Sequence, residues 1–255
     1  MLVHHAYPVC EYDTDRNPVI KPADSLEKCL PEKCVITFFR KELEQFVKDH
    51  DLSVIGHLHS EVLDLPIYDY RLGEERLCLT MPFCTAPGAA GTIEELRAMG
   101  CRKFVICGGA GALVKGNRLG EIIVPASAIR DEGTSYHYLE PSREVACHPY
   151  ALETAVSTLT DMGVPFTPGK TWTTDAMYRE TPDMIELRRS EGCIAVEMET
   201  AAFFAVSQFY DIPLVQLLYA GDDVSGSAWD SRNWNTQKGI RANLIECSLK
   251  VMERL

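Results

Sequence analysis

The sequence contains no long apolar run and no excess of basic charge. No apolar segment reaches eighteen residues, so no membrane span is expected. The formal net charge is −12, from 37 acidic and 25 basic residues, and such a surface repels nucleic acid and anionic lipid. Residues 1–18 lack the basic-then-apolar layout of a secretory signal. These absences predict a cytoplasmic protein that binds neither nucleic acid nor membrane.

Metal-ligand spacing is missing as well. The chain has ten cysteines but no C-x-x-C, and close pairs such as Cys29 and Cys34 lack the spacing of zinc ligands. Several cysteines lie in apolar segments, where a free thiol behaves as a small hydrophobe. His57 and His59 are spaced for one face of a strand, but no third ligand is evident. We therefore expect reduced structural cysteines and no metal site.

No linker, repeat or low-complexity tract divides the chain. Strand-like runs such as 34–39 and 213–220 alternate with helical patterns such as 40–50. This alternation predicts one layered α/β domain over residues 1–255, with a mainly parallel sheet and an irregular arm at residues 1–33. Ligands of such folds bind at the carboxyl ends of the strands.

Two of the predicted strand ends carry unusual residues. In "CGGAGA" the glycines let backbone N–H groups approach a phosphate or a sugar, or form a tight turn from strand to helix. The segment is not G-x-G-x-x-G, and no Walker lysine follows it. In "GDDVSG", Asp222 and Asp223 are adjacent, and neighbouring carboxylates split their pKa values so that one can hold a proton near neutrality. The alternative for the aspartates is a solvated turn.

The segment "CIAVEMETAAFFAV" places two glutamates in apolar surroundings. In an extended chain Glu197 and Glu199 would point the same way, about 7 Å apart. A helix that begins near Thr200 would also put Glu199 at its positive end. Carboxylates only accept hydrogen bonds, so the pair suits the adjacent hydroxyls of a sugar. The alternative is a structural role in salt bridges with Arg188 and Arg189.

Together these segments resemble the nucleoside phosphorylase family, which includes uridine phosphorylases, hexameric purine nucleoside phosphorylases and nucleosidases. "AVEMETAA" is similar to the family's ribose-binding V-E-M-E-[AS]-A, and Asp222 lies 23 residues after Glu199, as in the family. "GGAGA", "DEGTSYHY" and "TTDAMY" occur in the family's order, so that the resemblance runs from about Leu77 to the carboxyl end.

The resemblance implies a three-layer α/β/α sandwich around a mixed, barrel-like central sheet, assembled as a homodimer or homohexamer. It also implies cleavage of the N-glycosidic bond of a nucleoside without a metal or organic cofactor. Phosphorylases use inorganic phosphate as co-substrate and release ribose 1-phosphate, whereas nucleosidases use water.

The resemblance also assigns residues. Glu199 would bind the ribose hydroxyls, with Met198 packed on the sugar and Glu197 orienting the base or the sugar. Asp222, when protonated, would donate to a ring nitrogen of a departing purine. The candidates to bind the base are Met177, Tyr178 and Asp223, and those to bind phosphate are Gly109, Arg179 and Arg40.

The phosphate-binding residues depart from the family. Phosphorylases carry a G-D-P-x-R type loop after the first strand, and "ITFFRKEL" retains at most its arginine, as Arg40. Ile106 stands where phosphorylases have an arginine, and Gly109 where they have a serine or threonine. Arg179 and Arg143 are candidates to replace the lost groups, because a guanidinium suits phosphate.

Three hypotheses remain. A nucleoside phosphorylase acting on a purine or pyrimidine nucleoside is favoured, a nucleosidase is the alternative, and a non-catalytic nucleoside-binding protein is the third. The presence of Asp222 argues against the third, because binding alone does not require an acid at the base.

Overall fold

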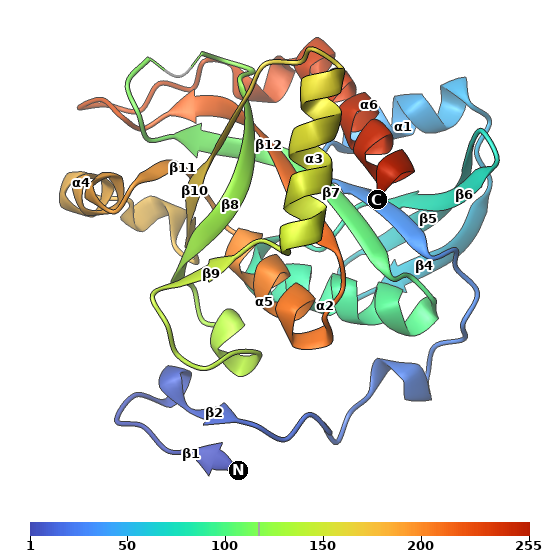
Figure 1. The fold of residues 1–255 in the computed structure, drawn as a ribbon, viewed down its shortest axis with the longest axis horizontal. Helices are drawn as coiled ribbons and strands as arrows, with labels where there is room; N and C mark the ends of the chain where they lie inside the picture. Colours follow the sequence, from blue (N-terminus) through green and yellow to red (C-terminus); the bar gives the residue numbers. More distant parts are fainter. Residues whose placement is uncertain (117) are drawn as a thin grey trace.

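The computed structural model describes residues 1–116 and 118–255 (Figure 1). Its strands are β1 (Leu2–Val3), β2 (Tyr12–Asp13), β3 (Lys33–Thr37), β4 (Val54–His59), β5 (Asp64–Leu72), β6 (Glu75–Thr80), β7 (Lys103–Ala112), β8 (Ile122–Asp131), β9 (Glu144–Ala146), β10 (Phe166–Thr174), β11 (Cys193–Glu197) and β12 (Leu214–Asp223). Its α-helices are α1 (Arg40–Asp49), α2 (Thr85–Met99), α3 (Pro149–Asp161), α4 (Pro182–Ser190), α5 (Thr200–Tyr210) and α6 (Lys238–Arg254). No helix in these described ranges is long and apolar enough to cross a membrane.

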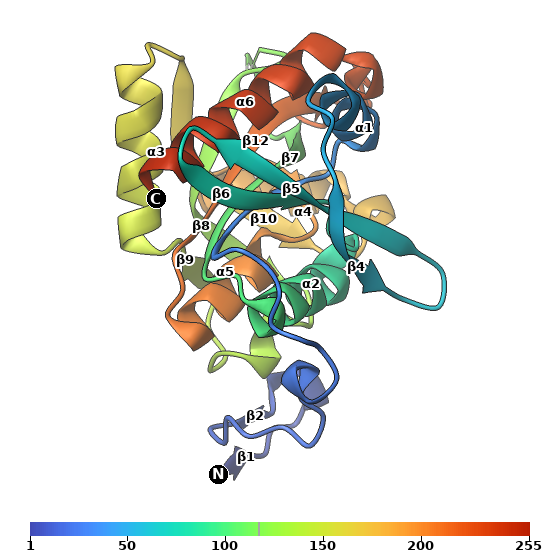
Figure 2. The same cartoon turned by 90° about the vertical axis from the view of Figure 1, so that its right-hand side faces the viewer.

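The main sheet is mixed and partly closed. Its strand order is β11-β10-β8-β12-β7-β3-β6-β5-β4, and β11 also pairs with β7. This second pairing closes β7, β12, β8, β10 and β11 into a barrel, while β3, β6, β5 and β4 extend it as an open wing. In Figure 2 the sheet separates α2 and α5 from α1, α3 and α6. The predicted three-layer fold around a barrel-like sheet is confirmed, although antiparallel pairs are more frequent than the sequence pattern suggested.

Helix α5 is buried and packs against several other elements. Nine of its eleven residues are buried, and it packs against α2 as well as against β8 and β12. A helix that is apolar all round belongs in the interior, which explains the sequence "TAAFFAVSQFY". Its partner α2 ends at Gly100, whose φ of +130° is strained for any residue with a side chain.

One sequence-based expectation was wrong in detail. The glycines of "GGAGA" do not form a turn, because β7 continues through them to Ala112. Strand β8 continues through Pro125, which faces a register shift between Gly169 and Lys170, and proline is tolerated beside such an irregularity. Asp222 and Asp223 lie at the end of β12, so their placement at a strand end is confirmed.

The first 32 residues form an extended arm. It contains a short antiparallel pairing of β1 with β2 and lies along the lower edge of the molecule in Figure 1. Most of its side chains are exposed, as expected for an irregular segment without a helical or strand period.

Candidate active site

The segment with the two glutamates spans the junction of β11 and α5. Strand β11 ends at Glu197, and Glu199 is the residue that precedes the first turn of α5. The expectation that both carboxylates lie on one strand face is therefore wrong, because the chain turns between them. The two glutamates have different surroundings as a result.

Glu197 is buried, and both of its carboxylate oxygens accept hydrogen bonds. Its Oε1 accepts from Thr173 Oγ1 at 2.6 Å, and its Oε2 accepts from the backbone N–H groups of Glu199 at 2.7 Å and Thr200 at 2.6 Å. Burial raises the pKa of Glu197, and these hydrogen bonds oppose the rise. Glu197 thus binds the free N–H groups at the start of α5.

Replacing Glu197 by alanine should destabilise the fold. The buried Thr173 hydroxyl and two N–H groups would lose their acceptor, and we expect a loss of about 2–3 kcal/mol in the free energy of unfolding. Urea denaturation followed by circular dichroism measures it. Glu186→Ala on α4, where the side chain is 74% exposed, is the matched control and should change stability by less than about 0.5 kcal/mol. Equal stability of the two variants would contradict the capping role.

The side chain of Glu199 has few donors among the described residues, and they are backbone N–H groups. The backbone N–H of Thr85, at the start of α2, donates to Oε1 at 2.7 Å. Burial raises the pKa of Glu199 to about 7, with a further contribution from the negative charge of Glu197. The half-buried Met198 lies beside it. This carboxylate is therefore placed to accept hydrogen bonds from a ligand.

Thr85 adopts a strained backbone conformation. Its φ is +70°, in the region that favours glycine, and it is a β-branched residue. Such strain costs about 1–3 kcal/mol and is often found where a backbone group must be aimed at a ligand or a functional side chain. Here the strained conformation presents the Thr85 N–H to Glu199.

Asp222 stands close to the glutamate segment because both flank β7. Val196 pairs with Gly111 across one edge of β7, and Asp223 pairs with Ala112 across the other. A Cβ atom at Gly111 would lie 3.0 Å from the Val196 side chain and 3.6 Å from Asp222 Oδ1. Glycine at position 111 therefore allows the ends of β11 and β12 to approach each other.

The two aspartates differ in their partners. Asp222 Oδ2 accepts a hydrogen bond from Trp229 Nε1 at 2.7 Å, and the Trp229 ring is largely exposed. Asp223 forms an ion pair with Arg232 and accepts from the backbone of Ser225 at 2.7 Å. Burial alone would raise the pKa of Asp223, but these partners lower it below its ordinary value. Asp222 is the aspartate whose partner lies on an exposed loop.

Glu180 is a second acid beside Asp222. It follows the 3₁₀ turn Met177–Arg179 at the end of β10, and it is half-buried. Burial and the negative charge of Asp222 together raise the pKa of Glu180 to about 7. Neighbouring carboxyl groups of this kind retain a proton near neutral pH.

The candidate phosphate-binding residues are dispersed. Arg40 and Arg179 are exposed, and no side-chain hydrogen bond or ion pair joins either of them to a residue in the described ranges. Arg40 begins α1 just after β3, and the adjoining Phe38 N–H donates to Cys107 of β7. Arg143 forms an ion pair with Glu191. On β7, the side of Gly109 that would carry a Cβ faces the Tyr219 ring at 3.1 Å.

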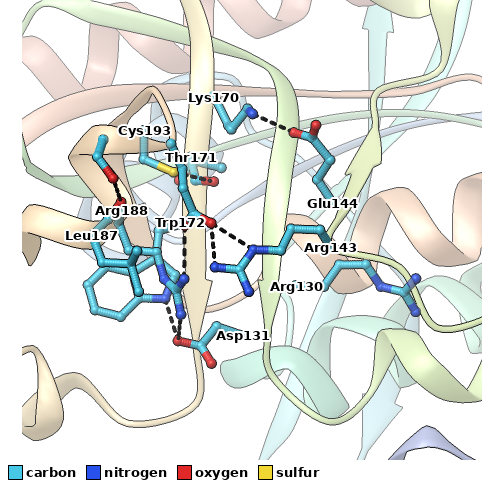
Figure 3. A network of polar contacts seen from close by, with 12 residues as sticks. Arg130, Asp131, Arg143, Glu144, Lys170, Thr171, Trp172, Leu187, Arg188 and Cys193 are labelled. Atoms are coloured by element: carbon cyan, nitrogen blue, oxygen red, sulfur yellow. Dashed lines mark hydrogen bonds and ion pairs between the residues drawn. The ribbon is translucent and has the colours of Figure 1, made fainter. Parts of the chain in front are cut away.

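Arg188 forms salt bridges with carboxylates other than those of Glu197 and Glu199. In Figure 3 its guanidinium donates to Asp131 Oδ2 at 2.8 Å, and this oxygen also accepts from Trp172 Nε1 at 2.9 Å. A further bond of 2.9 Å joins Arg188 to Glu191, and Arg189 pairs with Glu186. The proposed salt bridges from these arginines to Glu197 and Glu199 are therefore absent from the described part of the chain.

The predicted base-binding residues lie on the 3₁₀ turn after β10. Met177 is 49% exposed and Tyr178 is 92% exposed, so both present their side chains to solvent. Because β10 pairs with β11, this turn belongs to the same end of the barrel as Glu197. Met177 and Tyr178 remain candidates, with no described contact that tests them.

Sequence reasoning missed Thr85, Glu180 and Trp229. An aromatic residue in a serine-rich loop after "GDD" was a signal for Trp229, and Glu180 directly follows two residues that were selected. The sequence carries no signal for the Thr85 contact, because 114 residues separate Thr85 from Glu199.

Relatives of known activity match parts of this chain. Guanosine phosphorylase of Halorubrum lacusprofundi is 30% identical over 132 residues, which are 52% of this chain and 54% of that protein. Uridine phosphorylase of Thermococcus kodakarensis is 26% identical over 139 residues, covering 49% and 50% of the two chains. The chain thus spans about half the length of the curated relatives it matches.

Solved structures match over almost the whole chain. Uridine phosphorylase from Vibrio fischeri has a TM-score of 0.73 at 18% identity, with 91% of this chain and 93% of that chain covered. AMP nucleosidase from Bacteroides thetaiotaomicron has a TM-score of 0.70 at 22% identity, with 88% of each chain covered. At these identities the likeness shows the fold alone. A sequence model described as the phosphorylase superfamily matches residues 32–254, so this chain belongs to the phosphorylase superfamily.

Proposed function

We propose that this protein is a nucleoside phosphorylase that cleaves the N-glycosidic bond of a purine or pyrimidine nucleoside. The observation that carries the proposal is the approach of the end of β11, which leads into Glu199, to Asp222 at the end of β12, with Val196 and Asp222 on the two sides of Gly111. Glu199 has few protein donors. Asp222 lies beside Glu180, which holds a proton near neutrality. A nucleoside supplies hydroxyl donors for Glu199 and a basic leaving group for Asp222.

The two groups suit the charges of glycosidic cleavage. In an oxocarbenium-like transition state the ribose becomes positive and the departing base becomes negative. Ionised Glu199 would accept from the 2′- and 3′-hydroxyls and stabilise the positive ribose, more strongly in the transition state than in the ground state. Glu180 retains a proton near neutrality, and Asp222 would donate to the base after taking up that proton. Met198 would pack against the sugar, while Glu197 holds the start of α5.

Phosphate would bind through cations that follow the ends of two strands, β3 and β10. Arg40 and Arg179 are the proposed ligands, because both guanidinium groups lie on the surface without a described protein partner. The proposed assembly as a homodimer or homohexamer would allow a neighbouring subunit to add further groups.

Hydrolysis by water is the second candidate function. It is favoured by Ile106, which lies in the core with no exposed surface where phosphorylases carry an arginine. A nucleosidase needs Glu199 and the acid at the base but no phosphate-binding arginine.

A phosphate-dependence assay distinguishes the two functions. Inosine, guanosine, adenosine and uridine are incubated with and without inorganic phosphate, and free base and ribose 1-phosphate are quantified. We expect phosphate to raise base release at least about tenfold, and Arg40→Ala or Arg179→Ala to raise the KM for phosphate by a similar factor. Arg189→Ala, which removes an arginine paired with Glu186, is the matched control. Base release that is indifferent to phosphate would assign the protein to the nucleosidases.

A further inference from the structure

Two histidines and an aspartate converge on the β4–β5 hairpin, which extends beyond the body of the molecule in Figure 2. His57 and His59 are two residues apart on β4, so their side chains share one face of the strand. His59 pairs directly with Asp64, the first residue of β5. The third ligand that the sequence did not reveal is therefore Asp64, brought opposite the histidines by the hairpin.

The separations between the donor atoms fit a shared ion. His59 Nδ1 lies 3.2 Å from Asp64 Oδ1, and His57 Nδ1 lies 3.8 Å from the same oxygen. All three donor atoms lie within 4.8 Å of one another. Ligand atoms about 2.0–2.2 Å from a tetrahedral zinc ion are separated by ~3.4 Å, close to these values.

A second carboxylate, that of Glu95, approaches the cluster from α2. Glu95 is half-buried and lies close enough to His59 for the charges of the two side chains to interact. No hydrogen bond or ion pair in the described ranges engages the Glu95 side chain. An ion at the hairpin would thus have a further acidic group close by on the body of the protein.

We propose that His57, His59 and Asp64 form a binding site for one divalent transition-metal ion of the zinc class. Two imidazoles and one carboxylate favour zinc, nickel or cobalt over magnesium or calcium, which prefer oxygen ligands alone. The side chains of the three residues are 41%, 71% and 56% exposed, so the ion can reach them from solvent and keep water as a further ligand. The ion links the two strands of the hairpin, independently of the chemistry at Glu199.

Zinc titration of the full chain by calorimetry, after removal of metal with a chelator, tests the site. His57→Gln, His59→Gln and Asp64→Asn should each weaken binding about tenfold or more, since each removes a ligand. The matched control is His4→Gln, which alters a histidine 3.3 Å from the carboxylate of Glu11. Among the described residues no third ligand joins this pair, so the variant should bind zinc like the wild type. Unchanged affinity and stoichiometry in the His57→Gln/His59→Gln double variant would overturn the proposal.

Cobalt(II) spectroscopy distinguishes the histidine site from a site on the cysteines. Cys34, Cys78 and Cys101 also form a group of potential ligands, but all three are fully buried. Cobalt on imidazole and carboxylate gives d–d bands without the charge-transfer band of a thiolate, and these bands should vanish in the double variant. A thiolate band that persists in the double variant would place the ion on the cysteines instead. Equal thermal stability of the metal-free variants verifies that they are folded.

Discussion

Replacing Glu199 by glutamine should lower kcat/KM for nucleosides by about 10²–10³. Glutamine still accepts the hydrogen bond from Thr85, but it has no charge with which to stabilise the ribose in the transition state. Steady-state kinetics with inosine and uridine measure the loss, and we expect it mainly in kcat. Glu186→Gln, an exposed position on α4, should leave the rate unchanged.

The pH profile gives a second readout for Glu199. Its pKa is raised to about 7, and only the ionised form can accept both ribose hydroxyls. In the wild type kcat/KM should therefore fall as the pH drops through about 7, by up to tenfold per pH unit, because the carboxylate becomes protonated. The Glu199→Gln variant should lose this dependence.

Glu180 is the control for that assignment, because its pKa is also raised to about 7. Glu180→Gln should retain the decline on the acid side if Glu199 causes it. A Glu199→Gln variant with wild-type activity, or with the same acidic decline, would refute the proposed ribose role.

Replacing Asp222 by asparagine should lower kcat for purine nucleosides by about 10²–10⁴, the range expected for loss of a general acid. Asparagine has nearly the same shape and can still accept from Trp229, so the change removes the acid and little else. Turnover of inosine and guanosine measures the effect. Asp183→Asn, exposed in the first turn of α4, serves as the matched control.

A substrate whose leaving group needs no proton separates acid catalysis from a structural effect. 4-Nitrophenyl riboside departs as a stable phenolate, so Asp222→Asn should cleave it within about tenfold of the wild-type rate. A similar loss on both substrates would mean that the variant has damaged the ribose site. Unchanged purine turnover would show that another group protonates the base, and Glu180 would then be the first residue to test.

The sequence alone predicted the layered α/β architecture and the segments that form the site. Apolar residues identified the long helices, since α2, α5 and α6 each carry apolar side chains that must be buried. The resemblance of "AVEMETAA", together with Asp222 at its spacing, identified the family that the match over residues 32–254 establishes. These features are local, so the amino-acid sequence alone contains them.

Only the tertiary structure separated the roles of the two glutamates. Glu197 and Glu199 are the same residue type, but the turn between β11 and α5 places them in different surroundings. Glu197 accepts from a full set of donors, whereas Glu199 accepts a hydrogen bond from the N–H group of Thr85. The same holds for Asp222 beside Glu180 and for Asp64 opposite His59. Hydrogen bonds and carboxylate pKa values depend on neighbours that strand pairing and helix packing bring from distant parts of the chain, and local patterns do not contain them.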